Sequence, residues 1–354
     1  MAGKSPSNVT MADVARLSGV SLSTVSLVLN QKPGIPHKTR LKVLAAAETL
    51  GYQLKNAVAT GAKTERQQPV KTIGVFVKSQ IDDPIPPTSN AFYSYVLSGI
   101  EESCRVHNLL LVLSVVLVDV NSYPIEVPDL IQHKDIDAIL MVGVCINEML
   151  DAALKQTNTP VVLVDAYSYV ESYDAVVCAN FEAGYQAAHY LIEKGHRDIG
   201  FIGGYENGHP SFLDRRSGYL QALQDEEIEA SYLCDCSYNN PQAVFNALKS
   251  LKQENPQITA VLGCNDKVAL EIMQAAIALG LDIPNDLSVM GFDNIAMADK
   301  VNPPLTTIEI DKLSMGRLAV DLVFFRSRYP NAAMTKAALY PTLVERQSVQ
   351  SKPA

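Results

Sequence analysis

Hydrophobic positions along this chain follow two different periods, and the change comes near residue 70. Before it, apolar residues recur at helical spacing in three short segments, 11–18, 22–29 and 38–50. After it, short continuous apolar runs alternate with amphipathic stretches. Because strands buried on both faces and separated by helices are typical of parallel sheets, the second pattern predicts an α/β body behind a small helical domain.

The first two helical segments are predicted to form a helix-turn-helix. Thr10 stands three residues before Asp13, which is the spacing of a capping box, so we expect it to begin the first helix. Gly19 supplies the backbone freedom that a sharp turn between helices requires. Ser21 is placed to cap the second helix.

The second helix is expected to have two chemically different faces. At about 100° per residue, Val25, Val28 and Leu29 share one side. The opposite side carries no acidic residue and consists of Ser23, Thr24, Ser26, Leu27 and Asn30. Short hydroxyls suit phosphate oxygens and base edges, which favours DNA binding. From these residues alone, an ordinary helical hairpin with a hydroxyl-rich solvent face is the alternative.

The α/β body spans roughly 275 residues, which is large for one open sheet, so we expect two doubly wound lobes. The expected domains are a helix-turn-helix headpiece over 1–52, a polar linker over 53–70, a core over 71–348 and a tail over 349–354. Within the core, the first lobe is expected at about 71–166 and 296–328, and the second at about 167–295 and 329–348.

Charge is unevenly distributed along the 354 residues, whose net charge is −9. Residues 1–63 carry eight Lys and Arg against two acidic residues, which leaves a net −15 for the rest of the chain. A wholly basic nucleic-acid binder is therefore excluded. The asymmetry indicates a small nucleic-acid-binding module attached to an acidic body.

Targeting and metal-binding signals are missing from the sequence. No apolar segment of a signal peptide follows the polar first ten residues, and no apolar run approaches the roughly 20 residues of a membrane span. Cys234 and Cys236, the closest pair of six cysteines, have no histidine at metal-ligand spacing. We therefore expect a cytoplasmic protein with reduced, buried cysteines, no cofactor and no membrane partner.

Several predicted strands end in polar residues that suit hydroxyl recognition. In open α/β sheets, ligands bind outside the carboxyl ends of the strands, where this sequence places Asp165, Asn265, Asp266, Asp293 and Asn294. Arg215 stands early in a following helix, and aromatic residues follow other strands at Phe92, Tyr93 and Tyr238. An arginine, carboxylates and flat rings suit a polyol. The alternative is that each strand-end residue only caps the next helix.

Catalytic motifs are missing as well. The sequence has no GxGxxG opening a helix and no GxxxxGK[ST], GxSxG or HExxH, and its six histidines show no ligand-like spacing. We therefore expect a binding protein and no enzyme. An enzyme acting on a sugar or nucleotide, with Asp165 and Asp293 as acid and base, is disfavoured by the charge asymmetry. A free-standing solute-binding protein is disfavoured by the missing signal peptide.

Six stretches carry a resemblance to a known family: TMADVARLSGVSLSTVSLVLN, KTRLKVLAAAETLGY, HYLIEKGHRDIGFIGG, DRRSGYLQAL, LGCNDKVALEIMQAAIALGLDIPNDLSVMGFDN and PPLTTIEIDKLSMGRLAVDLV. Over essentially its full length, the chain resembles the lactose/galactose repressor (LacI/GalR) family of bacterial transcription regulators. The resemblance implies a periplasmic-binding-protein-like body of two lobes joined by three crossovers. It also implies homodimers on pseudo-palindromic operators, with DNA affinity set by a small molecule in the interlobe cleft.

The resemblance also implies roles for individual residues. Phosphate contacts are implied for Thr10, Ser21, Thr24, Ser26, Asn30 and Thr39, and base contacts for Leu22, Ser23 and Leu27. In the linker, Asn56 and Val58 match further DNA-contacting positions. The implied effector-binding residues are Phe92, Tyr93, Asp165, Arg215, Tyr238, Asn265 and Asp293.

The sequence departs from the family pattern at the DNA-binding end. Leu27 replaces an arginine that reads guanine in the best-known member, so we expect a different operator preference and contact with a thymine methyl. Pro36 replaces the usual serine cap of the third helix. The linker lacks the family's proline and offers Gly61 or Ala62 in place of a leucine that wedges into the minor groove, so we expect no such intercalation.

These patterns together predict a repressor of carbohydrate uptake or catabolism genes that responds to a sugar-like effector. A purine or nucleoside corepressor is the alternative, because Phe92 and Tyr238 would suit stacking on a base. The chain ends soon after LVERQSV without a leucine heptad tail, so a dimer is favoured over a tetramer.

Overall fold

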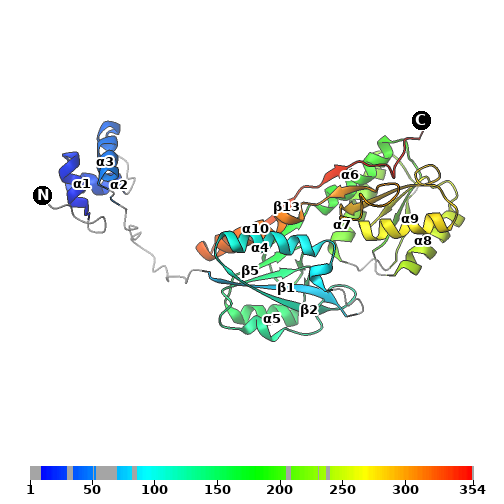
Figure 1. The fold of residues 1–354 in the computed structure, drawn as a ribbon, viewed down its shortest axis with the longest axis horizontal. Helices are drawn as coiled ribbons and strands as arrows, with labels where there is room; N and C mark the ends of the chain where they lie inside the picture. Colours follow the sequence, from blue (N-terminus) through cyan, green and yellow to red (C-terminus); the bar gives the residue numbers. More distant parts are fainter. Residues whose placement is uncertain are drawn as a thin grey trace. The chain divides into compact units, whose positions relative to one another are not determined.

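The computed structural model describes residues 9–29, 35–50, 52, 70–81, 86–204, 209–229, 231–236 and 240–352. The chain divides into two units, residues 1–66 and 67–354 (Figure 1). Among the described residues no single helix is both long and apolar enough to cross a membrane; the first two helices reach that length and composition only as a pair, bent by 106°.

The described part of the first unit forms three helices, as the apolar spacing predicted: α1 (Met11–Ser18), α2 (Leu22–Leu29) and α3 (His37–Thr49). Their shared core consists of Val14, Val25, Val28, Leu29, Val43, Ala46 and Ala47. A helix as short as α1 is marginal by itself, so burial against its neighbours stabilises the unit.

The ends of these helices follow the predicted local chemistry. At the start of α1, the Thr10 backbone N–H and hydroxyl both donate to Asp13 Oδ2, at 3.0 and 2.6 Å. Gly19 takes the left-handed conformation with φ of 69° and ends the helix. At the start of α3, the Pro36 carbonyl accepts from the backbone N–H groups of Thr39 and Arg40, both at 3.0 Å.

The first lobe of the second unit is built on a six-stranded parallel sheet of order β13-β7-β5-β3-β1-β2. The strands are β1 (Thr72–Gln80), β2 (Leu110–Val118), β3 (Ala138–Val142), β5 (Val161–Val164), β7 (Asp174–Cys178) and β13 (Lys336–Leu339). Figure 1 shows α4 (Tyr93–Val106) and α10 (Lys312–Arg328) on one face and α5 (Glu148–Thr157) on the other. Both faces are therefore buried, as the continuous apolar strands predicted.

The second lobe has a six-stranded sheet of order β14-β12-β11-β10-β8-β9, in which only β14 runs antiparallel to its neighbour. Its strands are β8 (Ile199–Ile202), β9 (Tyr232–Cys234), β10 (Ala260–Gly263), β11 (Ser288–Asp293), β12 (Thr306–Glu309) and β14 (Thr342–Val344). Its helices are α6 (Asn180–Glu193), α7 (Pro210–Asp225), α8 (Pro241–Glu254) and α9 (Asp266–Ala278).

Short elements complete the second unit. Strands β4 (Cys145–Ile146) and β6 (Tyr167–Ser168) pair with each other beside the first lobe. Two 3-10 turns, η2 (Pro87–Ser89) and η3 (Asp129–Gln132), connect elements of the same lobe.

The chain crosses between the lobes three times, as the family resemblance implied: from β7 to α6, from β12 to α10 and from β13 to β14. The expected lobe boundaries are nevertheless wrong in detail. Strands β7 and β13 belong to the first sheet, although 167–295 and 329–348 were assigned to the second lobe. Strand β12 belongs to the second sheet, although 296–328 was assigned to the first. Apolar runs mark where strands lie, but the partner of each strand is decided by tertiary hydrogen bonding.

Candidate nucleic-acid interface and interlobe site

Helix α2 presents the face that its sequence predicted. Val25, Val28 and Leu29 are buried, whereas Leu22 and Leu27 are 53% and 41% exposed. Ser21 and Ser23 are exposed, and Thr24 and Ser26 are half-buried. An isolated leucine on a surface is ordinary, but two beside a row of hydroxyls give this face both apolar and polar contacts to offer.

The hydroxyls at the start of α2 are held by one another. Ser21 Oγ lies 2.8 Å from Ser23 Oγ and 2.8 Å from Thr24 Oγ1, and it accepts the Thr24 backbone N–H at 3.2 Å. Ser21 is thus the expected cap, and its hydroxyl contacts those of Ser23 and Thr24. The other predicted phosphate contacts in this unit are Thr10, which is exposed, and Thr39, which is half-buried.

Four predicted site residues lie outside the described part of the chain: Asn30, Asn56, Val58 and Tyr238. Gly61 and Ala62, on which the expectation about the linker rests, lie outside it as well.

In the second lobe, Arg215 is the centre of a buried cluster. Its side chain donates through Nε to Asn180 Oδ1, through one terminal nitrogen to the Cys264 carbonyl and through the other to Asp293 Oδ1, each at 2.9 Å. Only 4% of Arg215 is exposed. Burial by itself would lower the pKa of Arg215, but the neighbouring Asp293 carboxylate and other acids keep it above the usual value. We call Asn180, Arg215 and Asp293 the second-lobe half-site.

In the first lobe, Asp165 has a matching set of partners. Tyr93 donates its hydroxyl to Asp165 Oδ2 at 3.0 Å, and both residues are buried. Lys78 Nζ donates to Ser122 Oγ at 3.2 Å and lies 5.3 Å from the centroid of the Tyr93 ring. Burial lowers the pKa of Lys78, and the Asp165 carboxylate opposes that effect. We call Lys78, Tyr93 and Asp165 the first-lobe half-site.

The two half-sites interact with each other electrostatically. Burial raises the pKa of Asp165 to about 6, and the charges of Lys78 and Arg215 oppose the rise. Tyr167 makes one direct contact between the lobes, because its hydroxyl accepts from Asn180 Nδ2 at 3.3 Å. Its ring meets the His209 ring edge-on, with centroids 5.2 Å apart.

The backbone at both acidic positions is unusual. Asp165 has φ of 46° and Asp293 has φ of 102°, in the region that side chains other than glycine rarely adopt. Lys312 donates from Nζ to the Asp293 carbonyl and thereby helps to hold that turn. Strained residues persist only where the surroundings determine them and are frequent at ligand sites.

Phe92 and Asn265 are the remaining residues that were predicted to bind the effector and that the structure describes. Phe92 is half-buried, and its ring packs edge-on against Tyr93 with centroids 5.2 Å apart. Asn265 Oδ1 accepts the Val268 backbone N–H at 2.9 Å and caps α9. For this oxygen, the alternative prediction that a strand-end residue caps the next helix is therefore confirmed. Asp266 is also buried, and it accepts from the Thr307 hydroxyl and the Ile295 backbone N–H.

Sequence reasoning missed Lys78, Asn180, Tyr167 and His209. Lys78 lies near the carboxyl end of β1 and Asn180 follows β7, so the strand-end rule that selected Asp165 would have found both. His209 precedes α7 and is buried, and its Nε2 has no hydrogen-bond partner among the described residues. Burial lowers the pKa of His209 well below its usual value. Among the described residues, no group of three or more His, Cys, Asp or Glu is placed to hold a metal ion.

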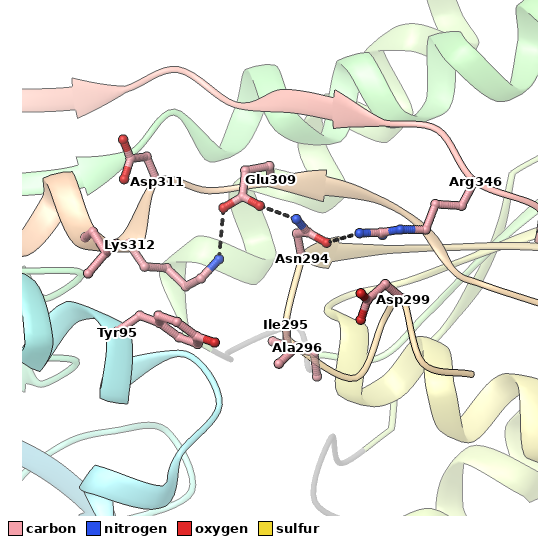
Figure 2. A pocket seen from close by; sticks show the side chains of 10 residues that line it. Tyr95, Asn294, Ile295, Ala296, Asp299, Glu309, Asp311, Lys312 and Arg346 are labelled. Carbon is pink, nitrogen blue, oxygen red and sulfur yellow. Dashed lines mark hydrogen bonds and ion pairs between the residues drawn. The ribbon is translucent and has the colours of Figure 1, made fainter.

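A cavity of about 280 Å³ lies at the second crossover (Figure 2). Its lining includes Tyr95 of the first lobe and Asn294 of the second, but none of the predicted effector residues. Figure 2 shows a polar row across it: Lys312 donates to Glu309 at 3.1 Å, Asn294 donates to the other Glu309 oxygen, and Arg346 donates to Asn294 at 2.6 Å. Because these groups satisfy one another, the row ties the crossover to the Asp293 turn.

Comparison with known proteins agrees with both units. Residues 10–54 match the family model described as bacterial regulatory proteins, lacI family, and residues 188–349 match that of a periplasmic binding protein-like domain. The ribose operon repressor of Haemophilus influenzae is 32% identical over 97% of this chain and 99% of its own length. The chain belongs to the LacI family of bacterial regulatory proteins. Another relative, the transcriptional repressor PurR of Pasteurella multocida, is 31% identical with the same coverage.

A solved member of the LacI family shares the fold. The structure of the Lac repressor dimer bound to operator and the anti-inducer ONPF matches with a TM-score of 0.64 at 24% identity, covering 97% of this chain and 99% of that one. The expected fold class, a helix-turn-helix headpiece with a periplasmic-binding-protein-like core, is thereby confirmed. This LacI-family chain is a DNA-binding transcriptional regulator, and α2 is the second helix of its helix-turn-helix.

Proposed function

We propose that this protein is a repressor of carbohydrate uptake or catabolism genes whose operator affinity is set by a sugar-like effector between the lobes. The observation that carries the proposal is the pair of half-sites, each assembled within one lobe and facing the other's charge across the cleft. A ligand that bonds to both halves favours the lobe arrangement that brings them together, so its binding energy is coupled to lobe position.

The chemistry of the half-sites supports a polyol. Asp165 and Asp293 supply carboxylate oxygens that accept hydrogen bonds from hydroxyls, and Arg215 supplies a planar set of donors. The Phe92 ring, half-buried at the same place, offers a flat surface to the apolar face of a sugar. The name of the ribose operon repressor, a relative at 32% identity, agrees with this class of ligand.

A purine or nucleoside corepressor is the second candidate. The half-buried Phe92 ring would also accept a stacked base. The buried guanidinium of Arg215 would suit a purine carbonyl as well as a hydroxyl. An enzyme that uses Asp165 and Asp293 as acid and base is disfavoured, because Asp293 is tied to Arg215 and Asp165 to Tyr93 within separate lobes.

On the DNA side, we propose that Ser21, Thr24, Ser26 and Thr39 contact phosphates while Leu22, Ser23 and Leu27 meet base edges. The proposal is supported by the exposure of Ser21, Leu22, Ser23 and Leu27 at the start and along one face of α2. Thr24 and Ser26 on the same helix and Thr39 on α3 are half-buried. Leucine cannot donate a hydrogen bond, so its contact with a base pair is apolar, and the thymine methyl is the apolar group of the major groove. We therefore expect an operator rich in A·T pairs opposite Leu22 and Leu27.

We further propose that the protein works as a homodimer joined through the edge of the first sheet. β2 is an edge strand with the sequence LLVLSVVLV, and Leu110, Leu113 and Val115 are 62%, 42% and 41% exposed. An exposed apolar edge of this length is an aggregation hazard unless another chain covers it. The Lac repressor, which shares the fold, is described as a dimer on its operator.

The experiment that tests this function has two steps. First, the full chain is used to select bound sequences from random double-stranded DNA, and a pseudo-palindrome with A·T pairs at the leucine positions is expected. Second, sugars, purines and nucleosides are screened for a change in operator affinity. A sugar that changes the affinity at least tenfold, while purines do not, supports the main proposal. A response to purines alone would replace it with the second candidate, and turnover of any bound compound would revive the enzyme.

A further inference from the structure

A second hollow, separate from the interlobe site, lies between α6 and the third crossover. Its volume is about 290 Å³. The lining consists of Glu182, Tyr185, Gln186 and His189 from α6, with Tyr340 and Pro341 from the segment between β13 and β14. We call it the α6 groove. None of its residues belongs to either half-site or to the cavity at the second crossover.

Aromatic rings form the walls of the α6 groove. Tyr185 and His189 stand one helical turn apart and stack with centroids 5.9 Å apart and an angle of 15° between the rings. Tyr340 is 76% exposed, which places a large ring in solvent at the edge of the hollow. A tyrosine ring presents a negative face, so the rings of Tyr185 and Tyr340 at this hollow attract positive charge.

The acidic side chains around the α6 groove also favour positive charge. Of the described residues that line it, none is Lys or Arg, and Glu182 is acidic and exposed. The rings are backed by further acids: Tyr185 donates its hydroxyl to Asp225 at 3.1 Å, and the His189 nitrogens lie 3.7 and 3.8 Å from Glu193 and Glu226. The groove therefore combines aromatic faces with a carboxylate and excludes anions.

One polar atom beside the groove also lacks a partner. Gln186 Oε1 is buried and accepts no hydrogen bond from the described residues. Buried acceptors are nearly always paired, and an exception calls for an explanation such as a bound donor.

We propose that the α6 groove is a binding site for a small organic cation of the ammonium class. The ring faces of Tyr185 and Tyr340 hold the cation, and Glu182 neutralises its charge, which is the combination that recognises alkylammonium groups. The site requires neither the sugar effector nor the operator, so its failure would leave the proposed function standing, and the reverse also holds.

The test compares two probes of equal shape and different charge. Choline is titrated into the full chain by calorimetry, and 3,3-dimethylbutan-1-ol, its uncharged carbon analogue, is titrated in the same way. We expect saturable choline binding, with the neutral analogue at least tenfold weaker. Equal binding of the two probes, or no choline binding up to roughly 10 mM, the range of the weakest specific small-ligand sites, overturns the proposal.

Variants locate the binding in the groove. Tyr340→Ala is expected to weaken choline at least fivefold, whereas Tyr340→Phe keeps the ring and binds as the parent does. Glu182→Gln is expected to weaken choline and leave the neutral analogue unchanged. Tyr169→Ala is the matched control, because Tyr169 is 73% exposed and lies outside the groove. If Tyr169→Ala weakens choline as much as Tyr340→Ala does, the groove is not the site.

Discussion

The DNA-facing side of α2 and the interlobe half-sites differ in how far their side chains are exposed and in which residues they contact. On α2, Leu22 and Leu27 are exposed, and Ser21 Oγ contacts its sequence neighbours Ser23 and Thr24. In the cleft, Arg215 and Asp165 are buried and bonded to residues distant in the sequence, such as Cys264 and Tyr93. One surface is open to its partner, and the other is already satisfied internally.

We relate this difference to two tasks, the recognition of DNA by α2 and the response of the two lobes to an effector. A DNA face whose leucines stand in solvent leaves no buried charge unpaired on binding, so its specificity depends on which side chains are present. Under the proposed function, an effector between the lobes exchanges bonds with groups that are already paired, because an unpaired buried charge is costly. The exchange gives the ligand different affinities for different lobe arrangements, which is the condition for a conformational response.

The largest effect is expected when Arg215 is removed from the buried second-lobe half-site. Arg215→Ala should lower the free energy of unfolding of the core by about 3–5 kcal/mol, because Asp293 keeps a buried carboxylate without its partner. The effector response should vanish while operator binding persists. Chemical denaturation and operator titration with and without effector measure both.

Arg216→Ala provides the control for this variant. Arg216 is the next residue, and it pairs with Asp235 at 2.8 Å nearer to solvent. Its loss should cost less than about 1 kcal/mol and leave the response intact. Loss of operator binding by Arg215→Ala in a protein that is still folded would count against a role confined to the cleft.

An intermediate effect is expected from the ionisation of Asp165 in the first-lobe half-site, which makes the stability of the protein depend on pH. Burial raises the pKa of Asp165 to about 6, above the unfolded value near 3.9. Its contribution to stability is therefore fully present below about pH 4 and is lost as the pH rises through about 6. Relative to Asp165→Asn, the parent protein should lose up to about 3 kcal/mol between pH 4 and pH 7.

Urea unfolding of both proteins across this pH range measures the difference. The Asn side chain can still accept from the Tyr93 hydroxyl, so the comparison isolates the ionisation. A difference that stays constant or grows in favour of the parent protein with rising pH would show that Asp165 does not carry a raised pKa.

The smallest effect on stability comes from the DNA face. Leu27→Ala should change the free energy of unfolding by less than about 0.5 kcal/mol, because the side chain is 41% exposed. It should reduce discrimination at one operator base pair by about 1–3 kcal/mol, the typical cost of one mismatched pair. Selection of bound DNA by both proteins, with thermal melting of each, gives the two numbers.

Val28→Ala is the matched control on the next residue of α2. Val28 is 2% exposed and belongs to the headpiece core, so its truncation should lower the melting temperature clearly. If Leu27→Ala melts as low as Val28→Ala, then Leu27 is a core residue and the assigned DNA face is wrong.

Local patterns predicted the headpiece well. The Thr10 and Asp13 capping interaction and the left-handed Gly19 turn involve residues only a few positions apart, so spacing alone specifies them. The exposure of Leu27 likewise follows from helical periodicity once Val25 and Val28 are taken as core.

The interlobe site was predictable in part. The strand-end rule found Asp165 and Asp293, since parallel strands bring their carboxyl ends to one edge. The strand-end rule did not predict that Asn265 Oδ1 caps α9, or that Lys78 lies close enough to Asp165 for their charges to interact. These outcomes depend on which strands are neighbours, and the strand order of a sheet leaves no local trace in the sequence.

By itself, the sequence determined the helical headpiece, the chemistry of α2, the α/β character of the core and most of the polar residues at strand ends. Those features depend on spacing over one or two turns of helix or along one strand. Only the tertiary structure decided which lobe owns β7, β12 and β13 and which charges pair around Arg215. It also decided that Tyr340 stands beside α6 to form an aromatic groove. These features join residues tens to more than a hundred positions apart, and such contacts are selected by the packing of the whole domain rather than by any local preference.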